Sequence, residues 1–341
     1  MKRLIAVPLA LIALASCAKT APPPETPEAA AITPPAPPPF EPRSFLPAET
    51  FALARLDVPR ILASPYFGWY ESFATTSLSP EETEQAEVFL ALARGVSELH
   101  VAFVPGTRSP DLGAVLFRST LGADQLREHI VRFTEEDDIV AMTLGGREAF
   151  GDDQGAFVHL ADDWWVGGPR ESLEATLASP ALPGALADAG WSQAEDRVAL
   201  PAPMVDVLLL GGNEGVRQAM RGSPLDPEDV EQVVAAAAEM DATDGVQVSA
   251  ALLTSDPALA QRVAADLQAQ LAEARSQAPP FVPIEPLLAG VTVAAAGGDV
   301  VVDVNISDAT VRAFYAVVSG FVGMFQNGAP GAPPPPPPTS P

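Results

Sequence analysis

The chain has 341 residues, of which 48% are hydrophobic, and its formal net charge at pH 7 is -25. This length allows one large or two medium-sized domains with a proper core, and a single cysteine excludes an internal disulfide bond. Between Phe45 and Gln326 there is no lysine and a large excess of acids, so we expect no binding to nucleic acid or to anionic lipid headgroups.

The first 17 residues have the pattern of a secretory signal. Lys2 and Arg3 are followed by an apolar run over residues 4–13, which is too short to span a bilayer. Residues 14–17, Leu-Ala-Ser-Cys, resemble the lipobox of bacterial lipoproteins. The resemblance implies a signal peptide of residues 1–16, cleavage before Cys17, and a lipid (palmitate among its acyl chains) on that cysteine. No aspartate follows Cys17, so the resemblance favours the outer membrane, facing the periplasm.

Proline-rich segments flank the folded part of the chain. Residues 17–44 are rich in Pro and Ala, and residues 327–341 contain six consecutive prolines. Such segments form extended polyproline II or disordered chain, not a packed core. We therefore expect a lipid-anchored tether before the folded region and a disordered tail after it.

The first folded half, residues 45–192, is predicted to begin with a strand at 51–56. A helix starting at Pro80 leads into the pair Gly95-Val96 and then into alternating strands. The further elements are strands at 99–104 and 113–118, a helix at 123–133, strands at 140–144, 148–150, 156–160 and 164–167, and a helix at 170–177.

The second half, residues 196–326, repeats several of these signals about 150 residues later. Leu-Pro-Ala occurs at 46–48 and 200–202, capped helix starts occur at 78–85 and 225–232, and Gly245-Val246 matches Gly95-Val96 as the end of the helix and the start of a strand. The predicted elements are strands at 204–210 and 246–254, a helix at 257–275, a hairpin at 291–306 and a helix at 308–325.

These patterns predict an α+β fold of two related lobes, each an antiparallel sheet packed against helices. The folded part loosely resembles uncharacterised envelope lipoproteins with repeated α+β units, a family from which no activity follows.

Signals for catalysis are absent from the sequence, and we expect no cofactor, no metal and no catalytic residue. His100, His129 and His159 lie on different elements without metal-ligand spacing, and His100 is interpreted as a surface residue. The folded region also lacks the lysine or free cysteine of several nucleophile classes. Gly211–Gly215 is interpreted as an ordinary turn, and the acidic clusters as solvated loops.

The best candidates for recognition are Trp164, Trp165, Asp162 and Asp163. Adjacent residues of a strand point to opposite faces, so only one indole enters a one-sided core. The two aspartates are predicted to form the tight turn of a hairpin. The exposed indole would then stack on a sugar ring or anchor a protein contact, unless the junction of the lobes buries it.

Three functions remain open at this point. The first is a non-catalytic binding or scaffolding module of the envelope, with the membrane as anchor and an envelope protein or glycan as partner. The second is a carboxylate-using hydrolase acting on envelope glycan, which needs paired acids beside aromatic side chains. The third is a carrier or chaperone with a hydrophobic groove between the lobes. A pocket at the junction of the lobes would distinguish them.

Overall fold

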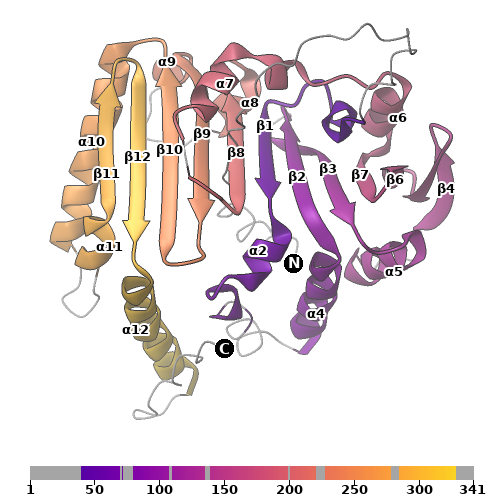
Figure 1. Ribbon diagram of the computed structural model, residues 1–341, viewed down its shortest axis with the longest axis horizontal. Coiled ribbons are helices and arrows are strands. Elements are labelled where there is room, and N and C mark those ends of the chain that lie inside the picture. Colours follow the sequence, from indigo (N-terminus) through magenta and orange to yellow (C-terminus); the bar gives the residue numbers. More distant parts are fainter. Residues whose placement is uncertain are drawn as a thin grey trace, which may run out of the picture.

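The structure is a computed structural model that describes residues 40–69, 71, 80–106, 110–134, 139–198, 200–219, 227–277 and 284–327. Within these residues the strands form one 12-stranded sheet in which every neighbouring pair is antiparallel (Figure 1). The signal peptide, Cys17 and the proline-rich tail lie outside the described residues.

The strands divide into a first half, up to β7, and a second half, from β8 onward. The first half contains β1 (Ala52–Leu56), β2 (Val96–Val104), β3 (Asp111–Ser119), β4 (Val140–Leu144), β5 (Arg147–Gly151), β6 (Gly155–Ala161) and β7 (Trp164–Pro169). The second half contains β8 (Val205–Leu210), β9 (Val233–Asp241), β10 (Val246–Thr254), β11 (Val291–Ala296) and β12 (Asp299–Ile306). The mixed helix and sheet class predicted from the sequence is confirmed.

Separate sheets in the two halves are not confirmed. β1 and β8 pair antiparallel from Ala52↔Leu209 to Leu56↔Val205, so the sheet continues across the junction. Outward from this central pair, the order is β2, β3, β7, β6 on one side and β9, β10, β12, β11 on the other. The hairpin of β4 and β5 extends the sheet at the first edge only.

Helices cover both faces of the sheet. In chain order they are η1 (Pro42–Phe45), α2 (Val58–Ala63), α4 (Pro80–Arg94), α5 (Ala123–Thr134), α6 (Arg170–Ala178), η2 (Gly184–Ala187), α7 (Ala189–Glu195), α8 (Glu214–Ala219), α9 (Pro227–Val230), α10 (Pro257–Gln277), α11 (Glu285–Ala289) and α12 (Asp308–Asn327). Within the described residues no helix has the length and apolar character that a membrane span requires.

One face of the sheet, which we call the pocket face, carries the largest core. Leu53 of β1 packs there with Leu173 of α6, Trp191 of α7 and Leu46 beside η1. On the opposite face, α5 packs Leu126 and Ile130 against β3 and β7, and α10 packs Ala260 and Ala264 against β12. Alternation along each strand creates this division, because successive side chains of a strand point to opposite faces.

Two tight turns form as their residues predict. Gly145 and Gly146 connect β4 to β5 with φ angles of 58° and 75°, which glycine adopts without steric cost. Asp162 and Asp163 connect β6 to β7, and Asp162 has a φ of 52°, a conformation that aspartate tolerates better than most residues. The predicted hairpin turn is therefore confirmed.

The prediction of a long helix that begins at Pro227 and ends before Gly245 is wrong. α9 ends at Val230, and residues 233–241, Val-Val-Ala-Ala-Ala-Ala-Glu-Met-Asp, form strand β9 between β8 and β10. Alanine favours helices in isolation, but here both edges of the segment are hydrogen-bonded to neighbouring strands, and tertiary pairing overrides that preference. As a result, Gly95-Val96 opens β2 whereas Gly245-Val246 opens β10, so these two pairs are not in equivalent places.

Candidate functional site

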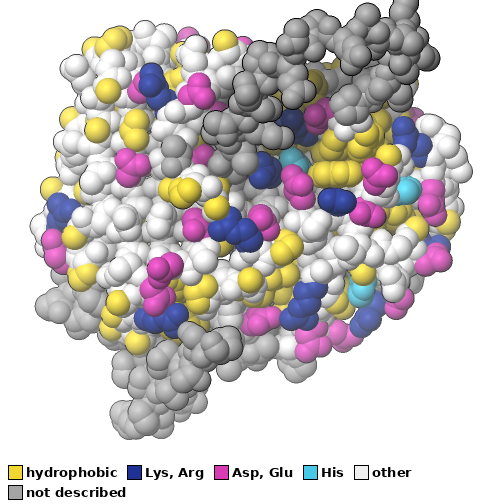
Figure 2. Space-filling model, viewed as in Figure 1, with side chains coloured by type: hydrophobic (Ala, Val, Ile, Leu, Met, Phe, Trp, Pro, Cys, Tyr) yellow, Lys and Arg dark blue, Asp and Glu magenta, His cyan; other side chains and the backbone are white. Residues whose placement is uncertain are grey.

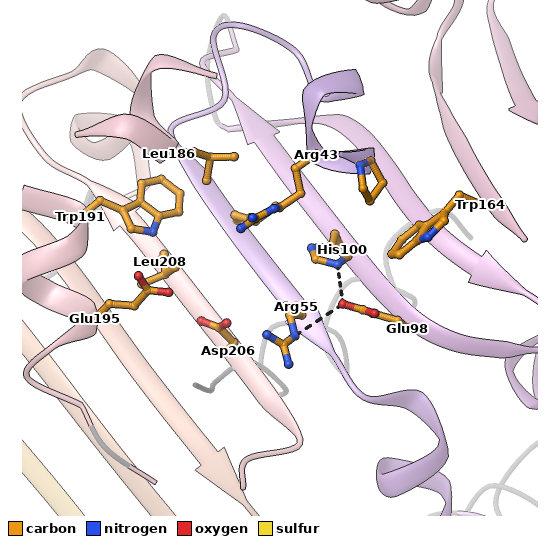
Figure 3. A pocket seen from close by; sticks show the side chains of 12 residues that line it. Arg43, Arg55, Glu98, His100, Trp164, Leu186, Trp191, Glu195, Asp206 and Leu208 are labelled. Atoms are coloured by element: carbon orange, nitrogen blue, oxygen red, sulfur yellow. Dashed lines mark hydrogen bonds and ion pairs between the residues drawn. The ribbon is translucent and has the colours of Figure 1, made fainter. Parts of the chain in front are cut away.

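A pocket of about 300 Å³ lies over the centre of the sheet, on the pocket face (Figure 3). Its floor comes from β8, β1 and β2, so both halves contribute to it. η1, η2, α7 and the start of β7 supply the walls. The pocket therefore exists only because the two halves share one sheet.

Strand register places a row of polar side chains along this floor. Arg55 lies opposite His100 on β2 and opposite Asp206 on β8. The row continues outward through Glu239 on β9 and Ser249 on β10. Directly opposite residues of antiparallel strands point to the same face, so these five side chains, which we call the polar row, share the pocket face.

On the β2 side, the polar groups bind one another. Oε1 of Glu98 is 2.9 Å from Nε2 of His100 and 3.7 Å from Nε of Arg55 (Figure 3). The hydrogen bond from His100, with a smaller contribution from the charge of Arg55, holds the pKa of Glu98 below its usual value.

His100 is not the surface residue that the sequence predicted. It is only 5% exposed, because Trp164 packs beside it with ring centroids 5.9 Å apart. Its second ring nitrogen, Nδ1, is buried and has no hydrogen-bond partner among the described residues. When Nε2–H donates to the Glu98 carboxylate, Nδ1 is left as an acceptor.

On the β8 side, the carboxyl groups have no such partners. Asp206 is 8% exposed and makes no hydrogen bond or ion pair within the described part of the chain. Burial raises the pKa of Asp206 to about 7, and the charge of Arg55 only partly opposes this effect. Glu195, the last residue of α7, also lines the pocket, and burial raises the pKa of its carboxyl group.

Glu239 is buried behind this wall of the pocket. It is 2% exposed, and its Oε2 accepts a hydrogen bond from the backbone N–H of Leu200. Burial raises the pKa of Glu239, while the hydrogen bond from Leu200 opposes the increase. Glu239 therefore anchors the chain after α7 onto the sheet.

Two indole rings stand on different walls of the pocket (Figure 3). Trp191 of α7 is 3% exposed, whereas Trp164 of β7 is half-buried. Leu186 and Leu208 lie on the same side as Trp191 and add apolar surface to that end of the pocket. Arg43 extends from η1 between the two indoles, and its Nε is bound to Glu41 at 3.0 Å.

On the face that carries the pocket, the acidic side chains do not form a separate negative patch. Figure 2 shows arginine side chains interspersed with acidic ones over the middle of the face in view. Within the described residues, no group of three or more His, Cys, Asp or Glu side chains is arranged to hold a metal ion.

The structure separates the four recognition candidates. Trp164 lines the pocket, whereas Trp165 lies on the opposite face in a core with Phe150, at a ring distance of 5.6 Å. Asp162 and Asp163 are exposed in the hairpin turn and do not line the pocket. Asp163 instead forms an ion pair with Arg118 at 3.3 Å.

Sequence reasoning missed Arg55, His100, Glu195 and Asp206 as site residues. A signal was present in two of them, because Arg55 and Asp206 are single charges inside otherwise apolar strands, Ala-Leu-Ala-Arg-Leu and Val-Asp-Val-Leu-Leu-Leu. Single buried charges of this kind are rare and call for an explanation.

Comparison with known proteins adds little to this site. No protein-family model matches the chain, and no curated protein matches it. Crystal form III of TP0453 is similar, with a TM-score of 0.46 and 9% identity over 81% of this chain and 98% of that chain. Crystal form IV has a TM-score of 0.45 and 10% identity, and crystal form I has 0.41 and 9%, each over 82% of this chain and 97% of that chain. A similarity of this size carries no information about function.

Proposed function

We propose that this protein is a lipid-anchored binding protein of the bacterial envelope, whose central pocket takes up a small polar ligand. The observation that carries the proposal is the set of unpartnered acceptors in the pocket. Asp206 and Nδ1 of His100 are buried there without a hydrogen-bond partner in the described residues, beside two indoles.

Buried polar groups in folded proteins are normally paired, and leaving one unpaired costs roughly 1–3 kcal/mol. A ligand that donates hydrogen bonds to Asp206 and His100 would recover this free energy on binding. The half-buried indole of Trp164 offers an apolar surface to the same ligand. Small-molecule sites combine these features, an apolar lining with a few convergent polar groups.

Ligand uptake is tested by screening small amines, neutral sugars and small carboxylic acids by thermal denaturation of the full chain. We expect members of one class to raise the melting temperature of the wild type and to lose this effect in Trp164→Ala. Glu174→Gln serves as control, because Glu174 is an exposed residue of α6 outside the pocket. A screen in which no compound stabilises the wild type would contradict the proposal.

Membrane anchoring is the second part of the proposal, and it rests on the lipobox resemblance at Cys17. The lipid would hold the protein at the outer membrane, and residues 17–44 would act as the spacer that lets the folded part stand away from it. Growth with labelled fatty acid should label the wild type but not Cys17→Ala. Label retained on the variant would refute the anchor.

We also propose that the two halves are related units that fold together. The matching strand order outward from β1 and β8 supports this relation, and the β1–β8 pairing supports joint folding. Residues 45–192 and 196–326 should therefore lose structure in one transition in the full chain. Two well-separated unfolding transitions would show that the halves are independent domains.

A hydrolase is the second candidate, because the pocket contains carboxyl groups whose pKa values are pushed apart. Burial keeps Asp206 partly protonated near neutral pH, as a general acid requires, while Glu98 is held ionised. Release of reducing sugar from envelope glycan, abolished in Asp206→Asn, would establish this activity. The carrier alternative lacks such support, since charged side chains interrupt the lining of the pocket.

A further inference from the structure

The charges of the pocket are balanced on one side and unbalanced on the other. Arg55 is 3.7 Å from the carboxylate of Glu98, and Arg43 is 3.0 Å from that of Glu41, so each guanidinium already has its own counter-charge. Asp206 and Glu195 have no ion pair within the described residues. A ligand that enters the pocket therefore meets, on the side formed by β8 and α7, the buried Asp206 and the exposed Glu195, neither in an ion pair within the described residues. Arg43 and Arg55 act on both carboxyl groups at longer range.

An aromatic surface stands on the same side. Trp191 and Glu195 are four residues apart on α7, and residues at this spacing are neighbours on one face of a helix. Figure 3 shows both side chains, with Asp206, around the same end of the pocket. Carboxylates in a pocket are the surroundings that stabilise an organic cation through charge pairing and charge-assisted hydrogen bonds.

Asp206 and Nδ1 of His100, the two unpartnered groups on which the proposed function rests, are hydrogen-bond acceptors. Nδ1 of His100 accepts when Nε2 donates to Glu98, and the carboxylates of Asp206 and Glu195 accept in their ionised forms. An ammonium group carries three donors and no acceptor, so it matches this set.

We infer that the pocket takes a small organic cation bearing a primary amine or guanidinium, bound by Asp206 and Glu195 at the end of the pocket formed by β8 and α7. This inference rests on the proposed function and specifies its ligand class. A volume of about 300 Å³ lies at the lower end of the range for small-molecule sites, so the cation is a small metabolite-sized molecule and not a polymer.

Binding of a cation should be coupled to loss of a proton from Asp206. The charged groups around this carboxyl are Arg55 on β1, Arg43 on η1, Glu195 on α7 and Glu239 on β9. Burial disfavours its ionised form, and the two neighbouring glutamates add to that effect. A bound cation supplies the missing counter-charge, so affinity should rise from pH 6 to pH 8 and a proton should be released to the buffer.

The test compares three four-carbon probes that differ only in their end groups: 1,4-diaminobutane, 1,4-butanediol and butanedioate. Calorimetry on the full chain at about 0.15 M salt should detect binding of the diamine alone, because salt at this concentration screens weak surface attraction. The measured heat should change between buffers of different ionisation enthalpy, which reports the released proton.

Three variants distinguish binding in the pocket from binding to acidic side chains on the surface. Asp206→Asn and Glu195→Gln should each weaken diamine binding about tenfold or more, as expected for loss of a charge-assisted hydrogen bond. Asp206→Asn should also remove the released proton. Glu174→Gln makes the same change of charge at an exposed site and should leave the affinity unchanged.

Each other outcome overturns a defined claim. Diamine binding that is equal in Asp206→Asn, Glu195→Gln and Glu174→Gln would place the cation elsewhere and overturn the inference. Binding of the diol or of butanedioate, but not of the diamine, would overturn the cation while supporting a ligand pocket. Binding of none of the three by the folded wild type would overturn the inference, whereas the proposed function fails only if no compound of the wider thermal screen stabilises the wild type.

Discussion

The polar groups on the two sides of the central pocket differ in whether they have bonding partners. On the β2 side, Glu98, His100 and Arg55 bind one another, and the pKa of Glu98 is lowered. On the β8 side, Asp206 is buried without a partner in the described residues, and its pKa is raised to about 7. Both sides belong to one polar row, so the difference comes from what covers each side.

This difference separates groups that stabilise the fold from groups that remain free for a ligand. A polar group that already has its partner adds a modest amount to stability, typically about 1 kcal/mol. A buried carboxyl without a partner destabilises the fold, and proteins keep such groups mainly at functional sites. The β8 side is therefore where we place ligand recognition.

The largest expected effect is on the α7 wall. Trp191→Ala removes an indole that is 3% exposed in the main core and should lower the free energy of unfolding by about 3–5 kcal/mol. Trp164→Ala, at a half-buried indole on the other wall, should cost less than half as much. Urea unfolding of the full chain measures both, and equal losses would show that the two walls are packed alike.

The second prediction concerns pH and Asp206. Its pKa is about 7 in the folded protein against an ordinary value of 3.8, so the folded state holds this proton more tightly than the unfolded state does. The stability that the proton contributes is present below pH 4 and is lost as pH rises toward and beyond 7. At 1.36 kcal/mol for each pH unit, Asp206→Asn should gain up to about 4 kcal/mol relative to wild type between pH 4 and 8.

Denaturant unfolding of both proteins across this pH range measures the effect. Asparagine has nearly the same shape, which makes Asp206→Asn a test of charge and not of packing. A stability difference that does not change with pH would show that Asp206 is ionised throughout.

The third prediction concerns the buried anchor beneath α7. Glu239→Ala leaves the N–H of Leu200 without its acceptor and should cost about 1–3 kcal/mol. Glu239→Gln keeps an acceptor oxygen in place and should cost clearly less. Thermal or urea denaturation distinguishes them, and equal losses would mean that the carboxylate charge, not the hydrogen bond, is what matters.

The smallest effect is expected on the β2 side. Glu98→Gln keeps the hydrogen bond to His100 but removes the charge facing Arg55, and an exposed pair of this kind is worth about 0.5–1 kcal/mol. The pKa of Glu98 is lowered, so its contribution is present above its ordinary value of 4.5 and is lost as pH falls below it. This pH dependence is opposite in sign to that of Asp206, and the same sign for both would contradict the comparison.

Most elements of the fold were predictable because they depend on local patterns. The alternation of apolar and polar residues predicted strands at Val246–Thr254 and Val291–Ala296. These bounds agree with β10 and β11 of the structure. The main local error was β9, whose alanines favour a helix in isolation. Only the presence of β8 and β10 on either side decides its conformation.

The candidate site was much less predictable than the elements. The sequence predicted that Trp164 and Trp165 face opposite sides of the sheet, which is a property of the chain alone, but not which of the two indoles lines a pocket. Arg55 and Asp206 are about 150 residues apart, and they become neighbours only through the β1–β8 register. No local pattern encodes that pairing, because it joins the first strands of two distant segments.

By itself, the sequence therefore determined the strands, the turns and the faces to which their side chains point, since these follow from steric preferences and from burial of apolar residues. The tertiary structure decided which charged residues meet and which are covered. α7 and η1 close over the central strands, and this covering buries Asp206 and His100 while leaving Glu98 at the open edge. Burial changes the electrostatic free energy of a charge far more than its local sequence does, and for that reason the site appears only in the folded protein.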